Sequence, residues 1–406
     1  MGKWKDKFKM RPTRHLHVDP SKRVPLLREQ KSAEDAPRDL KVGKTHTHPR
    51  ASSQSTVLPG AKPTTGAGAG DDASVYFIGN ATTIIEWQGL RILTDPNFLH
   101  AGDHVHLGPG VTAQRLKNPA VDMHELPPID LVLLSHYHED HFDKLVEDKL
   151  NRDFTIVSTP HAKGCLTSEA KVGSDGAGPF RAVHDIDTFE SLMLHMDGAK
   201  QDEHGKLPVV KITAMPGKHV PPGPLAAANN LLGAVPPTNG WLIEMAWPSN
   251  AMDAESVSVV DPGYRIYISG DTLFVDELKE IPKFIKEQQA LARQRRPHSH
   301  SQNSQDGDGD DDTRIDLMIV HLGGTTIPGP HMPLLMVTMD AKQGVELMKL
   351  LNPDLTMPVH FDDYSVMLSP LQDFKTEVAN MGEEWRDRVV YLERGEQFKF
   401  AVRGSK

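Results

Sequence analysis

A cluster of metal-binding residue types directly after an apolar run constrains this chain more than any other feature. The run 129–134 predicts a buried strand, and it is followed at once by His136, His138, Asp140 and His141. Alternate residues of an extended chain point the same way, so His136 and His138 can bind one ion while Asp140 and His141 reach a second. Imidazole and carboxylate suit zinc or a similar divalent transition metal. The sequence therefore predicts a metal site here, in preference to a polar loop that is merely rich in histidine.

The spacing His136-x-His138-x-Asp140-His141 is the HxHxDH signature, and in this respect the chain resembles the metallo-β-lactamase superfamily. The neighbouring motifs resemble one branch of it, which contains N-acyl-phosphatidylethanolamine phospholipase D and the ascorbate-phosphate lactonases. These motifs are Gly79-Asn80-Ala81-Thr82, Leu93-Thr94-Asp95-Pro96, the segment 125–130 and Ser269-Gly270-Asp271-Thr272. The resemblance runs from about Asp72 to the C-terminus. It implies hydrolysis at a dinuclear metal centre and leaves the substrate open.

The same resemblance implies a complete set of metal ligands. One ion is assigned to His136, His138 and His219, the other to Asp140, His141 and His360, and Asp271 to both. Asp95 is expected to orient the motif loop by hydrogen bonds without binding an ion itself. Without the resemblance, Asp271 could equally well be the N-cap of a helix instead of a metal ligand. Asp95 could likewise be an ordinary turn residue before Pro96. His321 is a rival for the place of His360, but it matches a substrate-binding loop of the family.

Short β-branched and apolar runs alternate with helical patterns along the chain, which predicts an α+β fold. A hairpin is expected over 75–87, with further strands at 90–94, 155–158, 209–215, 241–245, 256–260, 265–269 and 315–320. Helices are expected after the motif, over 274–291 and after Asp340, where Gln343 completes a variant of the capping box. The family resemblance implies that these elements form a four-layer αββα sandwich.

Charge divides the chain into a basic tail and an acidic body. Residues 1–70 hold 15 Lys and Arg against 6 Asp and Glu, whereas the remainder holds 30 against 49. Segment 1–71 is therefore expected to be a disordered tail and linker, and 72–406 the hydrolase domain, with a disordered insertion at 293–313. The acidic body disfavours nucleic acid as a partner. The basic tail is interpreted as a solvated arm, in preference to a segment that makes peripheral contact with an anionic membrane.

A single cysteine, Cys165, excludes an intramolecular disulfide and favours a reducing compartment. No run of 18 apolar residues is present, and the first residues lack the apolar stretch of a secretory signal. A cytoplasmic location is therefore expected. The sequence says nothing about the oligomeric state.

The uncharged loop from Val220 to Asn239 follows a ligand candidate and is long for a connection without secondary structure. It is interpreted as an apolar lid or rim that contacts substrate through Leu231 and Leu232, against the alternative of an ordinary surface loop. Two departures from the phospholipase pattern, Asn80 and Met339 in place of histidine, weaken any specific assignment to N-acyl-phosphatidylethanolamine.

Taken together, these features predict a hydrolase with two divalent ions, zinc before iron or manganese, and a bridging hydroxide. Asp140 is expected to orient the attacking water or to accept its proton. The scissile bond is an ester, lactone, amide or phosphodiester in a small-molecule or lipid-like substrate. The alternative is a non-catalytic metal-binding protein that retains the fold.

Overall fold

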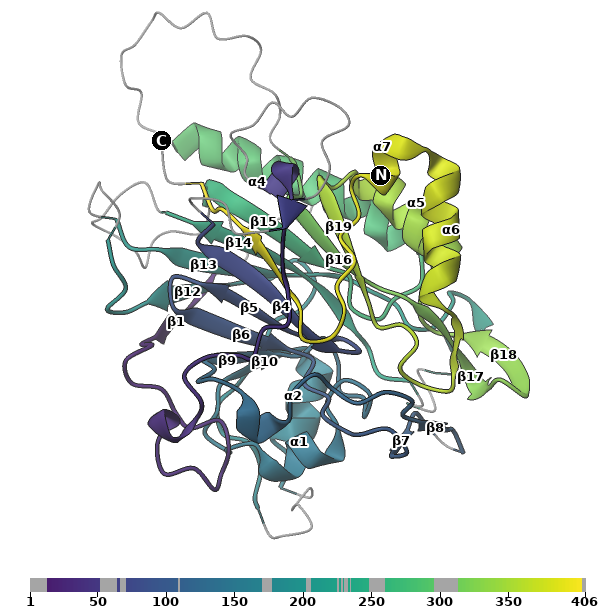
Figure 1. The fold of residues 1–406 in the computed structure, drawn as a ribbon, viewed down its shortest axis with the longest axis horizontal. Helices are drawn as coiled ribbons and strands as arrows, with labels where there is room; N and C mark the ends of the chain where they lie inside the picture. The colour runs from purple at the N-terminus through teal and green to yellow at the C-terminus, as the bar shows by residue number, and fades with distance from the viewer. Residues whose placement is uncertain are drawn as a thin grey trace, which may run out of the picture.

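Two β-sheets stacked face to face form the centre of the molecule (Figure 1). The computed structural model describes residues 13–51, 64–65, 71–108, 110–169, 177–201, 206–224, 226–227, 229, 233, 235–247, 260–295 and 313–403.

The first sheet has seven strands in the order β1-β12-β13-β14-β15-β16-β19. Their bounds are β1 Arg14–Val18, β12 Ser191–Met196, β13 Val209–Pro216, β14 Asn239–Ala246, β15 Pro262–Ile268, β16 Leu317–His321 and β19 Leu355–Val359. Strands β12 to β15 are antiparallel to one another, whereas β15, β16 and β19 run parallel. Residues 256–259 of the strand predicted over 256–260 lie outside the described residues, and β15 begins at Pro262, before the predicted start at 265.

The second sheet has nine strands in the order β11-β10-β9-β6-β5-β4-β21-β2-β3. Their bounds are β11 Val183–Asp185, β10 Ile156–Ser158, β9 Leu131–Leu133, β6 Leu90–Thr94, β5 Thr82–Trp87, β4 Ala73–Gly79, β21 Gln397–Phe400, β2 Thr45–Thr47 and β3 Thr64–Thr65. The hairpin β4–β5 and strand β6 lie where the sequence predicted them.

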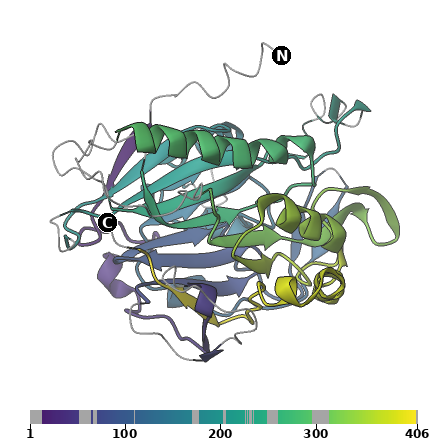
Figure 2. The same cartoon turned by 90° about the horizontal axis from the view of Figure 1, so that it is seen from above.

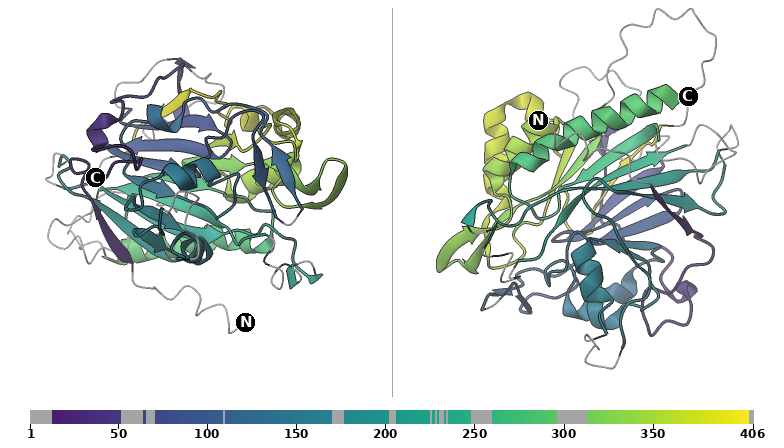
Figure 3. Two further views of the ribbon diagram at one scale, coloured as in Figure 1. Left: turned by 90° about the horizontal axis from the view of Figure 1, so that it is seen from below. Right: turned by 180° about the vertical axis from the view of Figure 1, so that it is seen from behind.

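Helices cover the outer face of each sheet, which confirms the predicted four-layer α+β sandwich (right-hand view of Figure 3; one helical layer is also seen in Figure 2). Alternate residues of each strand face the space between the sheets, such as Ile212, Ile243 and Ile266 from one sheet and Ile85 from the other. The helices are α1 Lys144–Lys149 and α2 Pro160–Leu166 on the nine-stranded sheet, and α4 Ile281–Arg295, α5 Ala341–Leu351, α6 Leu371–Met381 and α7 Glu383–Arg386 on the other side.

Two helices start at an aspartate N-cap, of which the sequence predicted the one at Asp340. Asp143 caps α1 by accepting a hydrogen bond from the amide of Val146 (2.8 Å), and Asp340 caps α5 by accepting one from the amide of Gln343 (2.9 Å). The side chain of Gln343 does not complete the capping box, because its Oε1 accepts instead from the amide of Phe274 (2.7 Å). That contact joins the start of α5 to the segment that precedes α4.

Two smaller hairpins stand at one end of the sandwich (Figure 1). Strands β17 Gly323–Gly329, β18 Met332–Met336 and β20 Met367–Ser369 form one small sheet, and β7 His104–His106 pairs with β8 Thr112–Gln114 in another. Ile327 of β17 packs against the apolar cluster that β7 and β8 form with Tyr364 and Val366. The two hairpins are thereby held together.

The prediction of a disordered tail over 1–71 is wrong for residues 13–51. Strand β1 pairs in parallel with β12, and β2 pairs with β21. Leu26 and Leu27 are buried against the apolar core beneath α1, and the Arg23 guanidinium bonds the buried Asp130 carboxylate at 2.7 and 3.0 Å. The average composition of the tail hid these local contacts, because edge strands form by backbone hydrogen bonds and a single ion pair suffices to anchor a basic segment.

The remaining parts of the predicted tail, 1–12, 52–63 and 66–70, lie outside the described residues. So does most of the predicted insertion at 293–313, except that α4 continues to Arg295. The helix predicted over 274–291 is divided into a 3-10 helix at Asp276–Glu280 and α4, with Pro282 in the first turn of α4. Within the described part of the chain, no helix combines the length and apolarity needed to cross a membrane.

Candidate metal centre

All the predicted ligands follow the ends of strands that meet at one end of the sandwich. The motif follows β9, and His219, Asp271 and His360 follow β13, β15 and β19 of the facing sheet. Strands β13 and β15 are both antiparallel to β14, and β15, β16 and β19 are parallel. The carboxyl ends of β13, β15, β16 and β19 therefore lie at the same end of the sheet. The topology therefore brings residues more than 200 positions apart into one site.

The structure brings all seven predicted ligands into two groups of donor atoms, each group with its atoms within 4.8 Å of one another. The first is His136, His138 and His219, and the second is Asp140, His141, Asp271 and His360. A third group, of Asp95, His141 and His321, overlaps the second. Histidine nitrogens and carboxylate oxygens in two adjoining groups are a donor set that suits a pair of divalent transition ions.

The donor atoms face one another across short distances. Nε2 of His136 and Nε2 of His219 are 2.9 Å apart, and Oδ2 of Asp271 lies 3.9 Å from Nε2 of His219 and 3.2 Å from Nε2 of His141. Asp271 is thus within reach of both groups. Nε2 of His360 lies 3.5 Å from both Asp271 and Asp140. A carboxylate in this position can bridge two ions.

Several of these buried atoms lack a well-formed hydrogen bond, although oppositely charged groups lie 3.2–3.8 Å away. They are both ring nitrogens of His138, Oδ1 of Asp140, Nε2 of His141 and Nε2 of His360. Leaving buried polar atoms without bonds is costly, and native proteins do so rarely. Metal coordination would satisfy one ring nitrogen of His138 and the atoms of Asp140, His141 and His360, so the residues fit the ions that the sequence implies.

The electrostatics of the site also suit cations. Burial lowers the pKa of His219 to about 4 and that of His136 well below its ordinary value, so both rings are neutral and keep a lone pair for an ion. Burial opposes ionisation of Asp271, but the nearby His360 and His141 hold its pKa well below the usual range. The same balance lowers the pKa of Asp140 through His141 and His138. Both carboxylates are therefore charged and require positive charge beside them.

Backbone and side-chain contacts fix the orientation of the rings. Nδ1 of His219 donates to the carbonyl of Val337 (2.8 Å), and Nδ1 of His360 donates to the carbonyl of Leu322 (3.0 Å). Each contact directs the other nitrogen, Nε2, into the centre, as is usual for metal-binding histidines. The hydroxyl of Thr338 donates to Oδ2 of Asp271 at 3.0 Å.

Asp95 lies where the resemblance implied, against the motif. Its Oδ1 accepts from the amide of Ser135 (2.7 Å), and its Oδ2 lies 3.4 Å from Nδ1 of His141. The sequence analysis noted Asn80 only as a departure from the family pattern. In the structure, Asn80 connects the segments that carry Asp140 and His360. Its side-chain Nδ2 donates to the main-chain carbonyl of Asp140 (2.6 Å), and its main-chain carbonyl accepts from the amide of His360 (2.8 Å).

Two other supporting groups, Ser135 and Thr338, gave no signal in the sequence, because their role depends on long-range contacts. His321, expected on a substrate loop, is buried at the end of β16, and its Nδ1 lies 3.0 Å from Oδ1 of Asp271. The structure thus places it behind a ligand candidate. Leu231 and Leu232, the expected lid contacts, lie outside the described residues.

Comparison with known proteins agrees with this geometry. Residues 90–361 match the model of the beta-lactamase superfamily domain. An uncharacterized protein of Mycobacterium tuberculosis is 36% identical over 93 residues, which cover 23% of this chain and 24% of that protein. The N-acyl-phosphatidylethanolamine-hydrolyzing phospholipase D 1 of Caenorhabditis elegans is 24% identical over 213 residues, 50% of this chain and 48% of that protein. These matches span at most about half of either relative.

Among solved structures, one described as a possible metal-dependent hydrolase from Veillonella parvula superimposes with a TM-score of 0.53. It shares 16% sequence identity and covers 80% of this chain and 98% of its own, so the likeness concerns the fold. The family model, by contrast, includes strands of both sheets and every predicted ligand. By this match the chain belongs to the beta-lactamase superfamily domain family.

Proposed function

We propose that the chain is a hydrolase that binds two divalent ions, preferably zinc, and cleaves an ester, lactone, amide or phosphodiester bond in a small or lipid-like substrate. One observation carries this proposal. Seven donor residues converge in two adjoining groups at the end of the sandwich, and five of their buried atoms lack a well-formed hydrogen bond. A protein that had lost catalysis would have no need to keep the whole set.

His136, His138 and His219 would hold one ion, Asp140, His141 and His360 the other, and Asp271 both. When bound, such ions supply Lewis-acid polarisation of the scissile bond and a water of lowered pKa. Asp140 would orient that water or accept its proton, and the lack of a well-formed hydrogen bond at its Oδ1 supports this role. His321 and Thr338 would hold the Asp271 carboxylate in position from behind.

The composition of the rim favours an apolar or acyl-bearing substrate. Between Asp316 and Asp340 the chain has no Asp, Glu, Lys or Arg, and this segment forms the hairpin β17–β18. Both ends of the segment contact the candidate metal centre, because His321 and Thr338 each lie against Asp271. Leu334 on β18 is 72% exposed, the most exposed large apolar side chain in the described chain. The phospholipase relative acts on an acylated lipid, which agrees with this class.

Mutation of the centre tests the proposal. His136→Ala and Asp140→Asn should each abolish hydrolysis and reduce the metal content of the purified protein, measured by elemental analysis. His124→Ala, which changes an exposed histidine away from the centre, serves as the matched control and should leave both unchanged. Full activity in an Asp140→Asn protein stripped of metal would exclude the mechanism.

A substrate panel identifies the bond. Lactones, N-acyl phospholipids, bis-p-nitrophenyl phosphate and single-stranded DNA are assayed with zinc at one pH. We expect turnover of an acyl-bearing or lactone substrate and none of DNA, because the acidic body repels polyanions. Metal bound at the centre without turnover of any of these would favour the alternative, a non-catalytic metal-binding protein.

A further inference from the structure

A fully buried arginine, Arg115, lies against the loop that carries the candidate ligand His360. It follows strand β8 directly, and the side chains of Arg115 and Asp363 are both closed to solvent. Nη2 of Arg115 lies 3.3 Å from Oδ1 of Asp363, and its Nε donates to the main-chain carbonyl of Lys117 (2.8 Å). The proposed reaction assigns no role to this buried charge.

One branch of contacts leads from Arg115 to the metal motif. Nη1 of Arg115 donates to Oδ1 of Asn97, and Nδ2 of Asn97 donates to the main-chain carbonyl of Glu139 (3.1 Å). Glu139 stands between His138 and Asp140 in the motif. Because Asn97 is fully buried, bulk water cannot replace these bonds when one partner is lost. Arg115 thus holds the motif loop through one intermediate side chain.

The other branch leads to the loop after β19. The Tyr364 hydroxyl accepts from Nη1 of Arg115 (3.2 Å) and from Nδ2 of Asn97 (2.9 Å). Burial raises the pKa of Tyr364, so this hydroxyl stays neutral. Asp363 joins the same loop to the turn before β5, since its Oδ2 accepts from the amide of Asn80 (3.1 Å). The loop that carries His360 is therefore fixed at two successive residues.

The backbone of this loop needs such support. His360 and Asp362 have φ +59 and +55, a conformation that residues with a side chain adopt only where the surroundings require it. The amide of Leu116 donates to the carbonyl of Asp363 (2.7 Å), and Arg115 pairs with Tyr364 in an antiparallel bridge. Main chain and side chain of the Arg115 segment together stabilise the conformation that presents His360 to the centre.

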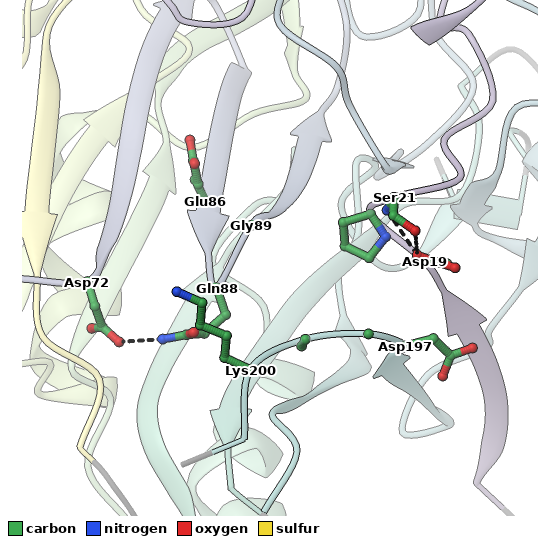
Figure 4. A pocket seen from close by; sticks show the side chains of 11 residues that line it. Asp19, Ser21, Asp72, Glu86, Gln88, Gly89, Asp197 and Lys200 are labelled. Carbon is green, nitrogen blue, oxygen red and sulfur yellow. Dashed lines mark hydrogen bonds between the residues drawn. The ribbon is translucent and has the colours of Figure 1, made fainter. Parts of the chain in front are cut away.

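Ion pairs elsewhere in the structure show why burial matters here. A cavity of about 570 Å³ beside the ends of β1 and β12 is lined by Asp19, among other polar residues (Figure 4). Asp19 pairs with Lys22 at 2.9 Å, but the Lys22 side chain is 82% exposed, and such a pair contributes little. The pair of Arg115 and Asp363 is closed to water, so neither member can exchange its partner for solvent.

We propose that Arg115 is a positioning residue of the candidate metal centre, which sets the separation of Asp140 and His360 and thereby the affinity for the ion between them. The inference rests on the proposed function, because it takes Asp140 and His360 as ligands of one ion. The contacts described above do not reach His136 or His219, two of the three candidates for the other ion. A change at Arg115 should therefore act on one ion of the pair.

Cobalt titration of the full chain tests this inference, because each bound ion adds its own visible absorption. The wild type should bind two ions. Arg115→Lys keeps the charge but loses the planar fork, so the affinity for one ion should fall about 10–100-fold while the other ion binds as in the wild type. At a cobalt concentration between the two affinities, the spectrum of Arg115→Lys should match that of His360→Ala and differ from that of His219→Ala.

Two further variants separate positioning from a general loss of stability. Arg265→Lys is the matched control, because Arg265 is similarly buried and its guanidinium lies 3.1 Å from the Glu244 carboxylate. It should lower stability without weakening either ion. Tyr364→Phe removes only the hydroxyl that contacts Arg115, so it tests the inference even if Arg115→Lys does not fold. It should weaken the same ion several-fold.

Hydrogen exchange of the metal-free protein gives a reading that does not depend on bound ions. Arg115→Lys should speed amide exchange in residues 138–142 and 360–366, while β12 to β14 keep their wild-type rates. Equal weakening of both ions, unchanged affinity in Arg115→Lys and Tyr364→Phe, or unchanged exchange in the two loops would overturn the inference and leave the proposed function standing. A wild type that binds no cobalt would overturn the proposed function, and this inference with it.

Discussion

Gly270 is the position at which backbone geometry controls the candidate metal centre most directly. It precedes Asp271 and has φ +59, a conformation that costs an L residue with a side chain about 1–2 kcal/mol. A Cβ atom added there would stand 2.4 Å from the carbonyl oxygen of Asn239 and 3.4 Å from Cβ of Ser135. The first contact is with backbone at the start of β14, which cannot move aside as a flexible side chain would.

Gly270→Ala should therefore destabilise the protein by two separate terms. The φ penalty is about 1–2 kcal/mol, and overpacking of this kind adds about 1–3 kcal/mol, so we expect a loss of about 2–5 kcal/mol. Relief of the clash also displaces Asp271 or Ser135, and both support the centre. Metal content and hydrolysis should fall together with stability.

Urea unfolding and elemental analysis measure these effects, and Gly89→Ala is the matched control. Gly89 has φ +83 in the turn between β5 and β6, and a Cβ there meets nothing within 4 Å. The control bears the φ penalty without the clash, so its stability loss should stay near 1–2 kcal/mol and its metal content should be unchanged. Equal losses of stability and metal in the two variants would refute the reasoning.

Three further changes test other parts of the structure. Asn80→Ala removes the bond to the Asp140 carbonyl and should weaken metal affinity about 10–100-fold with little change in fold, as read by metal titration and circular dichroism. Arg23→Met leaves the buried Asp130 without its guanidinium and should cost about 2–4 kcal/mol in urea unfolding, whereas a truly disordered tail would give no loss. Burial raises the pKa of Asp316 to about 6, above its value of about 4 in an unfolded chain, so the folded state binds this proton more tightly and loses stability as pH rises through that window. Asp316→Asn should flatten the pH profile of stability between about pH 4 and 6, and a steeper profile would contradict the assignment.

The local signals in the sequence were reliable. The metal motif, the cap at Asp340 and the hairpin over 75–87 all depend on residues close to one another in the sequence, so spacing alone predicts them. The apolar positions of α5 that follow the helical spacing, for example, are buried: Ala341, Val345, Met348 and Leu351. The four-layer arrangement needed the family resemblance, because periodicity does not say which sheet covers which.

The long-range contacts could not be predicted in this way. His219, Asp271 and His360 approach the motif only because strand ends of the seven-stranded sheet meet the end of β9 in the nine-stranded sheet, and their pairing was implied by resemblance. Ser135, Thr338 and the connecting role of Asn80 had no signal at all. The prediction for the tail was wrong because it relied on the average charge of the segment. That average does not show the buried Leu26 and Leu27 or the ion pair of Arg23.

The H-x-H pairs of this chain show what spacing can and cannot decide. His15 and His17 lie on β1 and His104 and His106 on β7, where alternation directs two imidazoles to one side, whereas His136 and His138 lie in the loop after β9. Their surroundings differ. His136 is fully buried against ligand candidates from the facing sheet, whereas His104 and His106 are exposed on a hairpin. His15 and His17 stand between these cases, half-open to solvent and in contact with a third histidine from β12, but the rings stack nearly parallel and their donor atoms do not converge. Spacing supplies two donors, and the neighbouring segments, which sequence does not reveal, decide whether they form a site.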